Sequence, residues 1–340
     1  MQVIDQASCV LAFFLRAAAV VAVAVLGAGL TACASADLAP APRSDSFSVR
    51  SLPGVDGQLL QALYRSERVA PLRYRVIVIP GSGCAGMGPW AERYFAGLLH
   101  AQVLVLHKPG VAPDSRTAPG DCSANFVQTD ALGAWREHAR AAVRADAAQR
   151  AGDPVMVALP QLLIGISEGA ELLPALAPEV VSLAGVVLIG SSGLNPLEAG
   201  TLQARRLGAA AWAQWQALGV AQAGDRPDSQ VQQGRSLRYW RDLWSWSLLP
   251  ALLAGPWPLL QVWGADDARV PASAYARFMA RAQGRVAPYC PRRLAGADHG
   301  LQRPAEPDGQ GGHDGVQQVW GWLENWARAA QPGMCAALAP

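Results

Sequence analysis

The pentapeptide GISEG at residues 165–169 places a serine between two glycines, an arrangement that can present a nucleophile. A serine hydroxyl can attack a carbonyl carbon, but it is a weak nucleophile unless a base lies next to it. Residues 160–166 form an apolar run that predicts a buried strand, and residues 168–176 predict a helix. A turn this sharp between strand and helix leaves room only for small neighbours, which explains the two glycines. The G-x-S-x-G pattern in this context predicts Ser167 as a nucleophile lifted toward a cleft.

Such a serine needs a general base, and the chain offers five histidines: His100, His107, His138, His299 and His313. The first two precede the predicted nucleophile, and His138 lies on a polar helical face where we expect it to be solvated. His299 stands in the sequence GADHG, directly after a short strand predicted at residues 292–295. His313 lies in a loop of sequence GGHDG and is the one serious competitor. We predict His299 as the base because of its position after a strand.

A carboxylate is also needed to orient the histidine. A predicted strand at residues 258–263, PLLQVW, runs into the segment GADDARVP at residues 264–271. This segment resembles the G-x-x-D-x-x-V-P pattern that members of the α/β-hydrolase superfamily often carry at this place. The superfamily orders its triad along the chain as serine, acid and histidine. The resemblance implies Asp267 as the acid, and Asp266 is the alternative.

The resemblance also implies which groups hold a negatively charged reaction intermediate. One is the backbone N–H of Glu168, the residue after the nucleophile. The other comes from the loop PGSGC at residues 80–84, which looks like the superfamily's H-G-x loop with Pro80 in place of histidine. This alignment implies the N–H of Ser82 as the second donor. Gly83 is the alternative, because glycine lets the backbone turn its amide inward.

The elements that would position these residues alternate along the chain. Residues 46–51 and 58–64 predict an opening hairpin, and apolar runs predict further strands at residues 75–80, 103–107 and 184–190. Helical patterns fall at residues 90–100, 130–150, 271–282 and 316–330. Strands that alternate with helices indicate an α/β protein whose mostly parallel central sheet has helices on both faces. This is also the α/β-hydrolase fold that the resemblance implies.

The segment 194–256 interrupts this rhythm and predicts a helical cap, inserted in a core of residues 46–193 and 257–335. The segment contains no clear strand. Six of the 12 tryptophans of the chain lie in it or beside it: Trp212, Trp215, Trp240, Trp244, Trp246 and Trp257. In the superfamily such a cap shapes the pocket for the acyl or alcohol group. Aromatic side chains can line that pocket or pack the cap onto the core, and we expect packing for most of them.

The N-terminal residues carry features of export. Residues 17–30 form an unbroken run of apolar and small residues after Arg16, and about fourteen residues are too few to span a bilayer. The run ends in LTAC, which resembles the bacterial lipobox and implies cleavage before Cys33 and lipidation of its thiol. We therefore predict residues 1–32 as a lipoprotein signal peptide and residues 33–45 as a tether. The alternative is an uncleaved anchor helix, which would have to bury Arg16.

Four further cysteines lie in the predicted core: Cys84, Cys122, Cys290 and Cys335. An even set in an exported chain indicates disulfides, and no spacing of Cys and His suggests a metal site. Cys84 and Cys122 follow strands that are consecutive in sequence, so their loops should emerge at the same edge of a parallel sheet. A bond between Cys290 and Cys335 would tie down the C-terminus. We therefore predict the pairs Cys84–Cys122 and Cys290–Cys335.

Composition narrows the class of protein further. The chain is 51% hydrophobic and only 16% charged, which excludes a disordered protein, and its 28 basic residues are scattered, which argues against nucleic acid. We expect an enzyme without a cofactor that hydrolyses a carboxylic ester of a small molecule through an acyl-enzyme. The alternatives are an acyltransferase or serine peptidase of the same fold and a non-catalytic envelope binding protein. Because Ala34 and not Asp follows Cys33, we expect the lipid anchor in the outer membrane, facing the periplasm.

Overall fold

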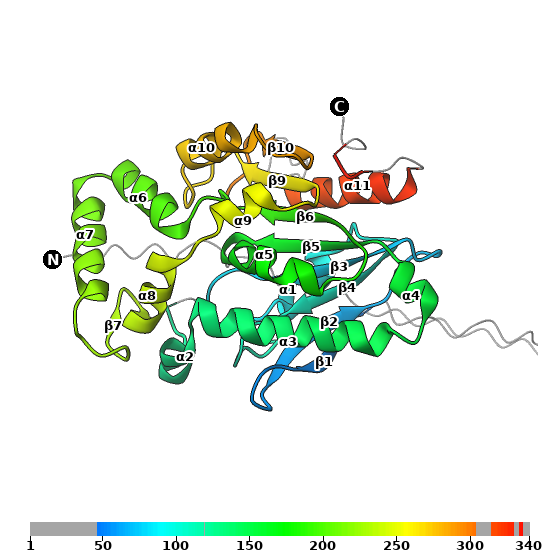
Figure 1. The fold of residues 1–340 in the computed structure, drawn as a ribbon, viewed down its shortest axis with the longest axis horizontal. Coiled ribbons are helices and arrows are strands. Elements are labelled where there is room, and N and C mark those ends of the chain that lie inside the picture. Colours follow the sequence, from blue (N-terminus) through cyan, green and yellow to red (C-terminus); the bar gives the residue numbers. More distant parts are fainter. Residues whose placement is uncertain (1–45, 119, 304–313, 330–332, 336–340) are drawn as a thin grey trace, which may run out of the picture. The chain divides into compact units, whose positions relative to one another are not determined.

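The computed structural model describes residues 46–118, 120–303, 314–329 and 333–335. Within them, one sheet of eight strands forms the centre of the fold (Figure 1). The strands are β1 (Ser48–Pro53), β2 (Leu59–Arg65), β3 (Tyr74–Ile79), β4 (Ala101–Leu106), β5 (Gln161–Ile166), β6 (Leu183–Ile189), β9 (Leu259–Gly264) and β10 (Tyr289–Leu294). Their order in the sheet is β1-β2-β4-β3-β5-β6-β9-β10. Strand β2 pairs antiparallel with β1 and β4, and every other pairing is parallel. The predicted mostly parallel sheet is therefore confirmed.

The central strands are buried on both faces, which is why their sequences read as continuous apolar runs. Every residue of β3 and β4 is buried. Strand β3 nevertheless contains Arg75, whose guanidinium lies 2.8 Å from a carboxylate oxygen of Asp146 and also donates to Gln102 and Gln161. A buried cation is tolerated when it is paired and hydrogen-bonded in this way. Edge strand β1 is mostly exposed, with Leu52 as its buried residue.

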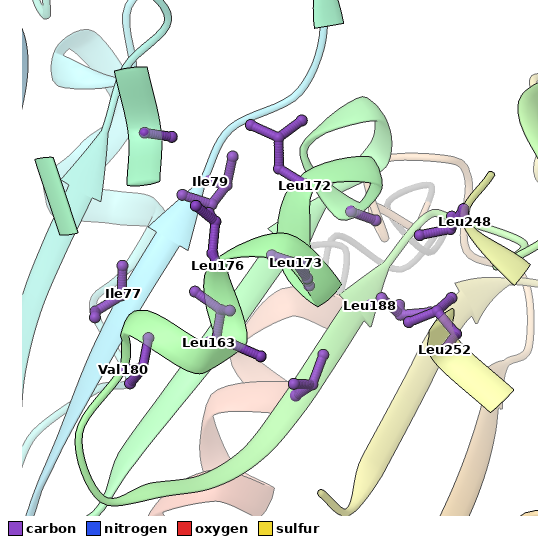
Figure 2. Close-up of a cluster of buried hydrophobic side chains, with 14 of the residues drawn as sticks. Ile77, Ile79, Leu163, Leu172, Leu173, Leu176, Val180, Leu188, Leu248 and Leu252 are labelled. Carbon is purple, nitrogen blue, oxygen red and sulfur yellow. The ribbon is translucent and has the colours of Figure 1, made fainter. Parts of the chain in front are cut away.

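Helices cover both faces of the sheet, as the sequence predicted. One face carries α3 (Leu132–Arg150), the 3₁₀ helices η1 (Ser167–Leu172) and η2 (Ala177–Glu179), α5 (Leu173–Leu176), α9 (Leu249–Ala254) and α10 (Ala272–Ala282). Figure 2 shows this core, where Leu173 and Leu176 gather with Ile77, Leu163 and Leu188 of the sheet. The other face carries α1 (Gly88–Tyr94) and α11 (Gly315–Arg328). The α/β architecture is thus a sheet between two helical layers, with a core on each side.

Between β6 and β9 the chain forms α6 (Pro196–Leu207), α7 (Ala209–Ala223), α8 (Leu237–Ser245) and α9, and in Figure 1 helices α6 to α8 lie together beyond one end of the sheet. The prediction that this segment lacks a strand was wrong, because β7 (Val231–Gln232) pairs with β8 (Arg235–Ser236). The two intervening residues, Gln233 and Gly234, both have positive φ, as a tight two-residue hairpin turn requires. Two-residue strands are too short to give a periodic signal in sequence.

Tryptophans of this segment pack its helices together, as the sequence suggested for most of them. Trp215 of α7 and Trp244 of α8 stack with ring centroids 4.3 Å apart. The indole N–H of Trp240 donates to the carbonyl of Gln232, and that of Trp246 donates to the carbonyl of Glu171. These contacts join the helices of the segment to each other and to the core.

Other differences from the predicted elements are local. Two short helices, α2 (Ala124–Thr129) and α4 (Pro154–Ala158), were not predicted, and α1 ends at Tyr94 rather than at residue 100. The prediction of a solvated His138 was wrong. Its side chain is buried where α3 crosses the β1–β2 hairpin, and its Nδ1 accepts a hydrogen bond from the backbone N–H of Val55 at 3.2 Å. The helical pattern alone did not show which element would cover this face.

Both predicted disulfides are present. The Cα atoms are 5.7 Å apart in Cys84–Cys122 and 5.5 Å apart in Cys290–Cys335, within the range that such bonds require. Cys290 lies within β10 rather than before it, and the first bond links the loops after β3 and β4. Among the described residues we find no helix long and apolar enough to cross a membrane and no group of three side chains suited to hold a metal ion. Cys33 and the predicted signal peptide and tether lie outside the described residues.

Candidate active site

Ser167 lies at the sharp turn between β5 and η1, where its backbone has a φ of 50°. This left-handed conformation is uncommon for a residue with a side chain, and its strain is tolerated only where the surroundings fix it. The flanking glycines show how tightly the turn packs. A Cβ on Gly165 would lie 2.5 Å from the Cα of Ala170, and one on Gly169 would lie 2.2 Å from the carbonyl oxygen of Ile79. Larger residues at these two positions would displace the backbone that carries the serine.

His299 lies in the loop after β10, and its Nε2 is 3.1 Å from the hydroxyl oxygen of Ser167. Bonds within the loop hold it in shape: the backbone N–H groups of Asp298 and Leu301 donate to the carbonyls of Gln302 and Asp298, respectively. The imidazole also packs against the loop after β6. A Cβ on Gly190 would lie 3.3 Å from its Cε1 atom, and the φ of 63° at that glycine further restricts substitution.

The carboxylate of Asp267 lies on the other side of the imidazole, with Oδ2 2.9 Å from Nδ1 of His299. Its Oδ2 also accepts a hydrogen bond from the hydroxyl of Tyr275, and its Oδ1 accepts from the backbone N–H groups of Arg269 and Val270. Burial by itself would raise the pKa of Asp267, but the hydrogen bonds from His299 and the backbone outweigh it and hold the pKa below its ordinary value. The carboxylate is therefore kept charged, buried and fixed in orientation.

The loops after β9 and β10 touch each other, which sets the distance between the acid and the imidazole. A Cβ on Gly264 would lie 2.1 Å from the carbonyl oxygens of Ala297 and Asp298. The backbone N–H of Asp266 donates to the carbonyl of Ala297, and Asp266 itself is exposed. Of the two aspartates considered from the sequence, only Asp267 has its carboxylate bonded to the imidazole. His313, the competing histidine, lies outside the described residues.

The loop after β3 passes against the nucleophile turn. A Cβ on Gly81 would lie 3.4 Å from the Cβ of Ser167, so the loop that holds Ser82 borders the serine. Ser82 is exposed, Gly83 has a φ of 96°, and Cys84 joins the loop to Cys122. The disulfide ties the predicted oxyanion loop to the loop after β4. The donor roles of Ser82 and Glu168 stay predictions.

Glu168 belongs to a buried ionic network that the sequence reading missed. Its carboxylate pairs with the ammonium of Lys108, which also lies 3.0 Å from Asp130. Arg235 of β8 pairs with Asp130 and lies 3.8 Å from Glu168. The hydroxyl of Tyr239 in α8 donates to Glu168 at 2.8 Å. Two cations and two anions thus join the segment between β6 and β9 to the residue after the nucleophile.

The network explains why the side chain of Glu168 is charged although it is largely buried against the nucleophile turn. Burial alone would raise the pKa of this carboxyl, but Lys108 and Arg235 outweigh it and hold the pKa below its ordinary value. For Asp130, burial is the larger effect and the pKa lies above its ordinary value. One sequence signal pointed here: Lys108 is the only lysine in the chain and directly follows a buried strand.

A pocket of about 200 Å³ opens beside Ser167. Its walls come from the nucleophile turn, the loop after β6, and helices α6 and α8, and its lining includes Glu168, Glu171, Ser191 and Tyr239. A larger pocket of about 530 Å³ lies between α3, α5, α8 and α9, and Glu171 lines this pocket too. The sequence reading singled out neither Glu171 nor the two pockets, since their walls come from segments far apart in the chain.

The strand order, the sharp turn that carries Ser167 and the loops that carry Asp267 and His299 together define the α/β-hydrolase fold. No protein-family model matches the sequence, and no curated protein matches it.

Solved structures do share the fold. An esterase from Pyrobaculum calidifontis matches with a TM-score of 0.54 and 16% identity, covering 83% of this chain and 86% of that chain. Est1E from Butyrivibrio proteoclasticus matches with a TM-score of 0.51 and 14% identity, covering 82% and 96%. A puromycin-hydrolyzing peptidase from Mycobacterium tuberculosis matches with a TM-score of 0.52 and 17% identity over 83% of this chain, but only 39% of that longer chain. At such identities the likeness establishes the fold and not the activity.

Proposed function

We propose that the protein is a serine hydrolase that cleaves a carboxylic ester, or a related acyl bond, through an acyl-enzyme on Ser167. The observation that carries this proposal is the continuous hydrogen-bonded chain from the Ser167 hydroxyl through His299 to the buried carboxylate of Asp267. Nucleophile, base and orienting acid lie in the geometry that acyl transfer requires. The chain has the fold of solved esterases, which supports this class of reaction.

In the proposed first step, the Ser167 oxygen attacks the acyl carbon while Nε2 of His299 takes the hydroxyl proton. Asp267 holds the imidazole with its Nδ1–H pointing at the carboxylate, and its charge stabilises the imidazolium that forms. The imidazolium then gives its proton to the leaving alcohol. In the second step His299 removes a proton from water, the resulting hydroxide attacks the acyl carbon, and Ser167 recovers its proton as the acid leaves.

The oxyanion of each tetrahedral intermediate is proposed to accept hydrogen bonds from the backbone N–H groups of Glu168 and Ser82. Donors fixed before the reaction stabilise this charge without reorganising, and one such donor is worth about 3–4 kcal/mol. The Lys108 network supports this role because it anchors the side chain of Glu168, and the Cys84–Cys122 bond anchors the loop of Ser82. We propose that the segment 194–256 acts as the cap of this site, since its helices line the pocket beside Ser167.

A fluorophosphonate probe tests the nucleophile directly. It should label wild-type protein at Ser167 and should not label Ser167→Ala, while hydrolysis of short-chain para-nitrophenyl esters is lost in the same variant. His299→Ala should lower kcat/KM by several orders of magnitude, on the scale of triad removals. His313→Ala is the matched control and should cost little. Absence of labelling in folded wild-type protein would favour the non-catalytic binding protein instead. Transfer of the acyl group to an added amine or alcohol in preference to water would favour an acyltransferase.

We also propose that the protein is exported and anchored by a lipid on Cys33, as the resemblance of LTAC to the lipobox implies. The two disulfides support an oxidising compartment, because such bonds persist outside the cytoplasm. In cells, Cys33→Ser should block processing or release the protein from the membrane fraction, with Cys9→Ser as the matched control. Fractionation of the wild-type protein with the cytoplasm would contradict the proposal.

A further inference from the structure

The pocket beside Ser167 contains two acidic side chains with different surroundings. Glu168 is paired with Lys108 and accepts a hydrogen bond from Tyr239. Glu171 lies one turn further along η1, and its Oε2 is shielded from solvent while no described residue donates a hydrogen bond to it. The indole of Trp246 donates to the backbone carbonyl of Glu171 at 3.1 Å, so the residue itself is held in place. Glu171 as a residue is half-buried, and its Oε2 is the shielded oxygen without a partner.

A shielded carboxylate oxygen without a partner is costly, because it loses its hydration and gains nothing in exchange. Burial, and then the negative charge of Glu168, raise the pKa of Glu171 well above its ordinary value. The surrounding cations are already engaged. Lys108 and Arg235 balance the two carboxylates of their own network, and Arg136, which lines the larger pocket, pairs with Glu137 at 2.8 Å. Among the described residues, no basic side chain lines the pocket beside Ser167.

We propose that Glu171 binds an ammonium group on the acyl part of the substrate, so that the enzyme prefers acyl groups that carry a primary amine. Ser167 and Glu171 line the same pocket, so a chain bonded to the serine oxygen through its acyl carbon can extend toward this carboxyl. An ammonium brings the charge and the hydrogen-bond donors that the protein does not supply, and the pair then stabilises the charged form of Glu171. This inference rests on the proposed acyl transfer at Ser167.

The test compares para-nitrophenyl esters whose acyl chains have the same length and differ only at the end. The ε-aminocaproyl, ε-hydroxycaproyl and heptanoyl esters end in an ammonium, a hydroxyl and a methyl group, and the β-alanyl and butanoyl esters repeat the comparison with a shorter chain. Each kcat/KM is divided by the uncatalysed hydrolysis rate, which removes the intrinsic effect of the charge. Wild-type enzyme should prefer the ammonium over the methyl ester by about 10- to 100-fold in one of the two series, the size of a hydrogen bond to a charged group.

Glu171→Gln should reduce this ratio to within about threefold of unity, because the amide keeps the shape but loses the charge. Glu92→Gln is the matched control: it removes the same charge from an exposed residue that lines neither pocket and should keep the wild-type ratio. A wild-type ratio near unity in both series, an unchanged ratio in Glu171→Gln, or a hydroxyl ester as good as the ammonium ester would each overturn the inference.

A second measurement uses wild-type enzyme alone and so does not depend on the folding of a variant. Pentylammonium should inhibit butanoyl ester hydrolysis competitively, with an inhibition constant about tenfold or more below that of pentanol. Equal inhibition by the two would overturn the inference. Failure of the proposed function looks different: neither the butanoyl nor the heptanoyl ester is hydrolysed and the fluorophosphonate probe does not label Ser167. That result would remove both proposals, whereas hydrolysis without a preference for the amine removes only this one.

Discussion

Replacing Lys108 by methionine should destabilise the fold strongly, because it removes one of the two cations of the buried ionic network. Methionine keeps the apolar stem of the side chain, so the charge is the main thing lost. The side chains of Lys108 and its partner Asp130 are each only 3% exposed. The ammonium nitrogen lies 4.4 Å from the ring centroid of Trp135. In wild type, two cations face two carboxylates. In Lys108→Met, only Arg235 remains to balance Asp130 and Glu168. One carboxylate must then stay unpaired or take up a proton.

The distances set the size of the effect. Opposite charges 3.0 Å apart attract by about 5 kcal/mol at an effective dielectric constant of 20, part of which offsets the cost of burial. Breaking a buried pair by removing one partner typically costs about 3–5 kcal/mol. We therefore expect Lys108→Met to lower the free energy of unfolding by about 3–5 kcal/mol at pH 7. Urea denaturation followed by tryptophan fluorescence measures it.

Two comparisons separate the network from a general effect of substitution. Arg238→Met removes an exposed cation from the same helix as Tyr239 and should change stability by less than about 0.5 kcal/mol. The double variant Lys108→Met with Asp130→Asn should be more stable than the sum of the single changes implies, by about 1–3 kcal/mol, because the unpaired charge is removed. A loss below about 1 kcal/mol in Lys108→Met, or strict additivity in the double variant, would refute the reasoning.

Three further predictions concern stability. Burial lowers the pKa of His107 from 6.5 to about 4, so the unfolded chain takes up the proton at a higher pH than the folded chain does. The free energy of unfolding should therefore fall by about 3 kcal/mol as the pH falls from 6.5 to about 4. Urea unfolding across this range should show no such loss in His107→Gln, and parallel pH curves for the variant and wild type would contradict the prediction. The hydrogen bond from Arg144 lowers the pKa of Glu179 to about 2, with the help of Arg140 and against the effect of burial. The stability that these ion pairs contribute is therefore fully present above pH 4.5 and is lost as the pH falls toward 2. Because Arg144 is exposed and Arg140 is partly exposed, solvent weakens both pairs, and Glu179→Gln should cost only about 1 kcal/mol at pH 7. A loss that persists undiminished at low pH would argue against the assignment. Cys84→Ser with Cys122→Ser opens a loop spanning 38 residues and should cost about 4 kcal/mol, measured by urea denaturation under non-reducing conditions; unchanged stability would contradict it.

The sequence by itself determined the layers of the fold and the turn that carries Ser167. Buried parallel strands need continuous apolar residues and the turn needs glycines at fixed positions, so both leave a local pattern. The same reasoning gave the pairing of Cys84 with Cys122, because the carboxyl ends of parallel strands share one edge. His299 could be selected because it follows a predicted strand that ends at that edge. Asp267 could be selected from the resemblance of its segment to the G-x-x-D-x-x-V-P pattern.

Only the tertiary structure decided which side chains meet across the molecule. Asp266 and Asp267 are neighbours in sequence. The backbone of their loop is bonded to the loop after β10, and this contact fixes Asp267 as the residue that turns its carboxylate toward the imidazole. The burial of His138 depends on the β1–β2 hairpin that covers α3. The contacting residue of this hairpin, Val55, lies more than eighty residues earlier in the chain. A helical pattern records which residues share a face, but not which element packs against it.

The surroundings of the nucleophile were likewise decided by long-range packing. The pairs that Lys108 and Arg235 make span 22 to 105 residues of sequence, and the charges of such scattered residues follow no period. Glu168 and Glu171 look alike in sequence, one turn apart on the same short helix. The folded chain distinguishes them, because it brings two cations and a hydroxyl to the first and leaves the second facing a pocket. Electrostatic surroundings depend on distances in space, which the order of residues along the chain does not encode locally.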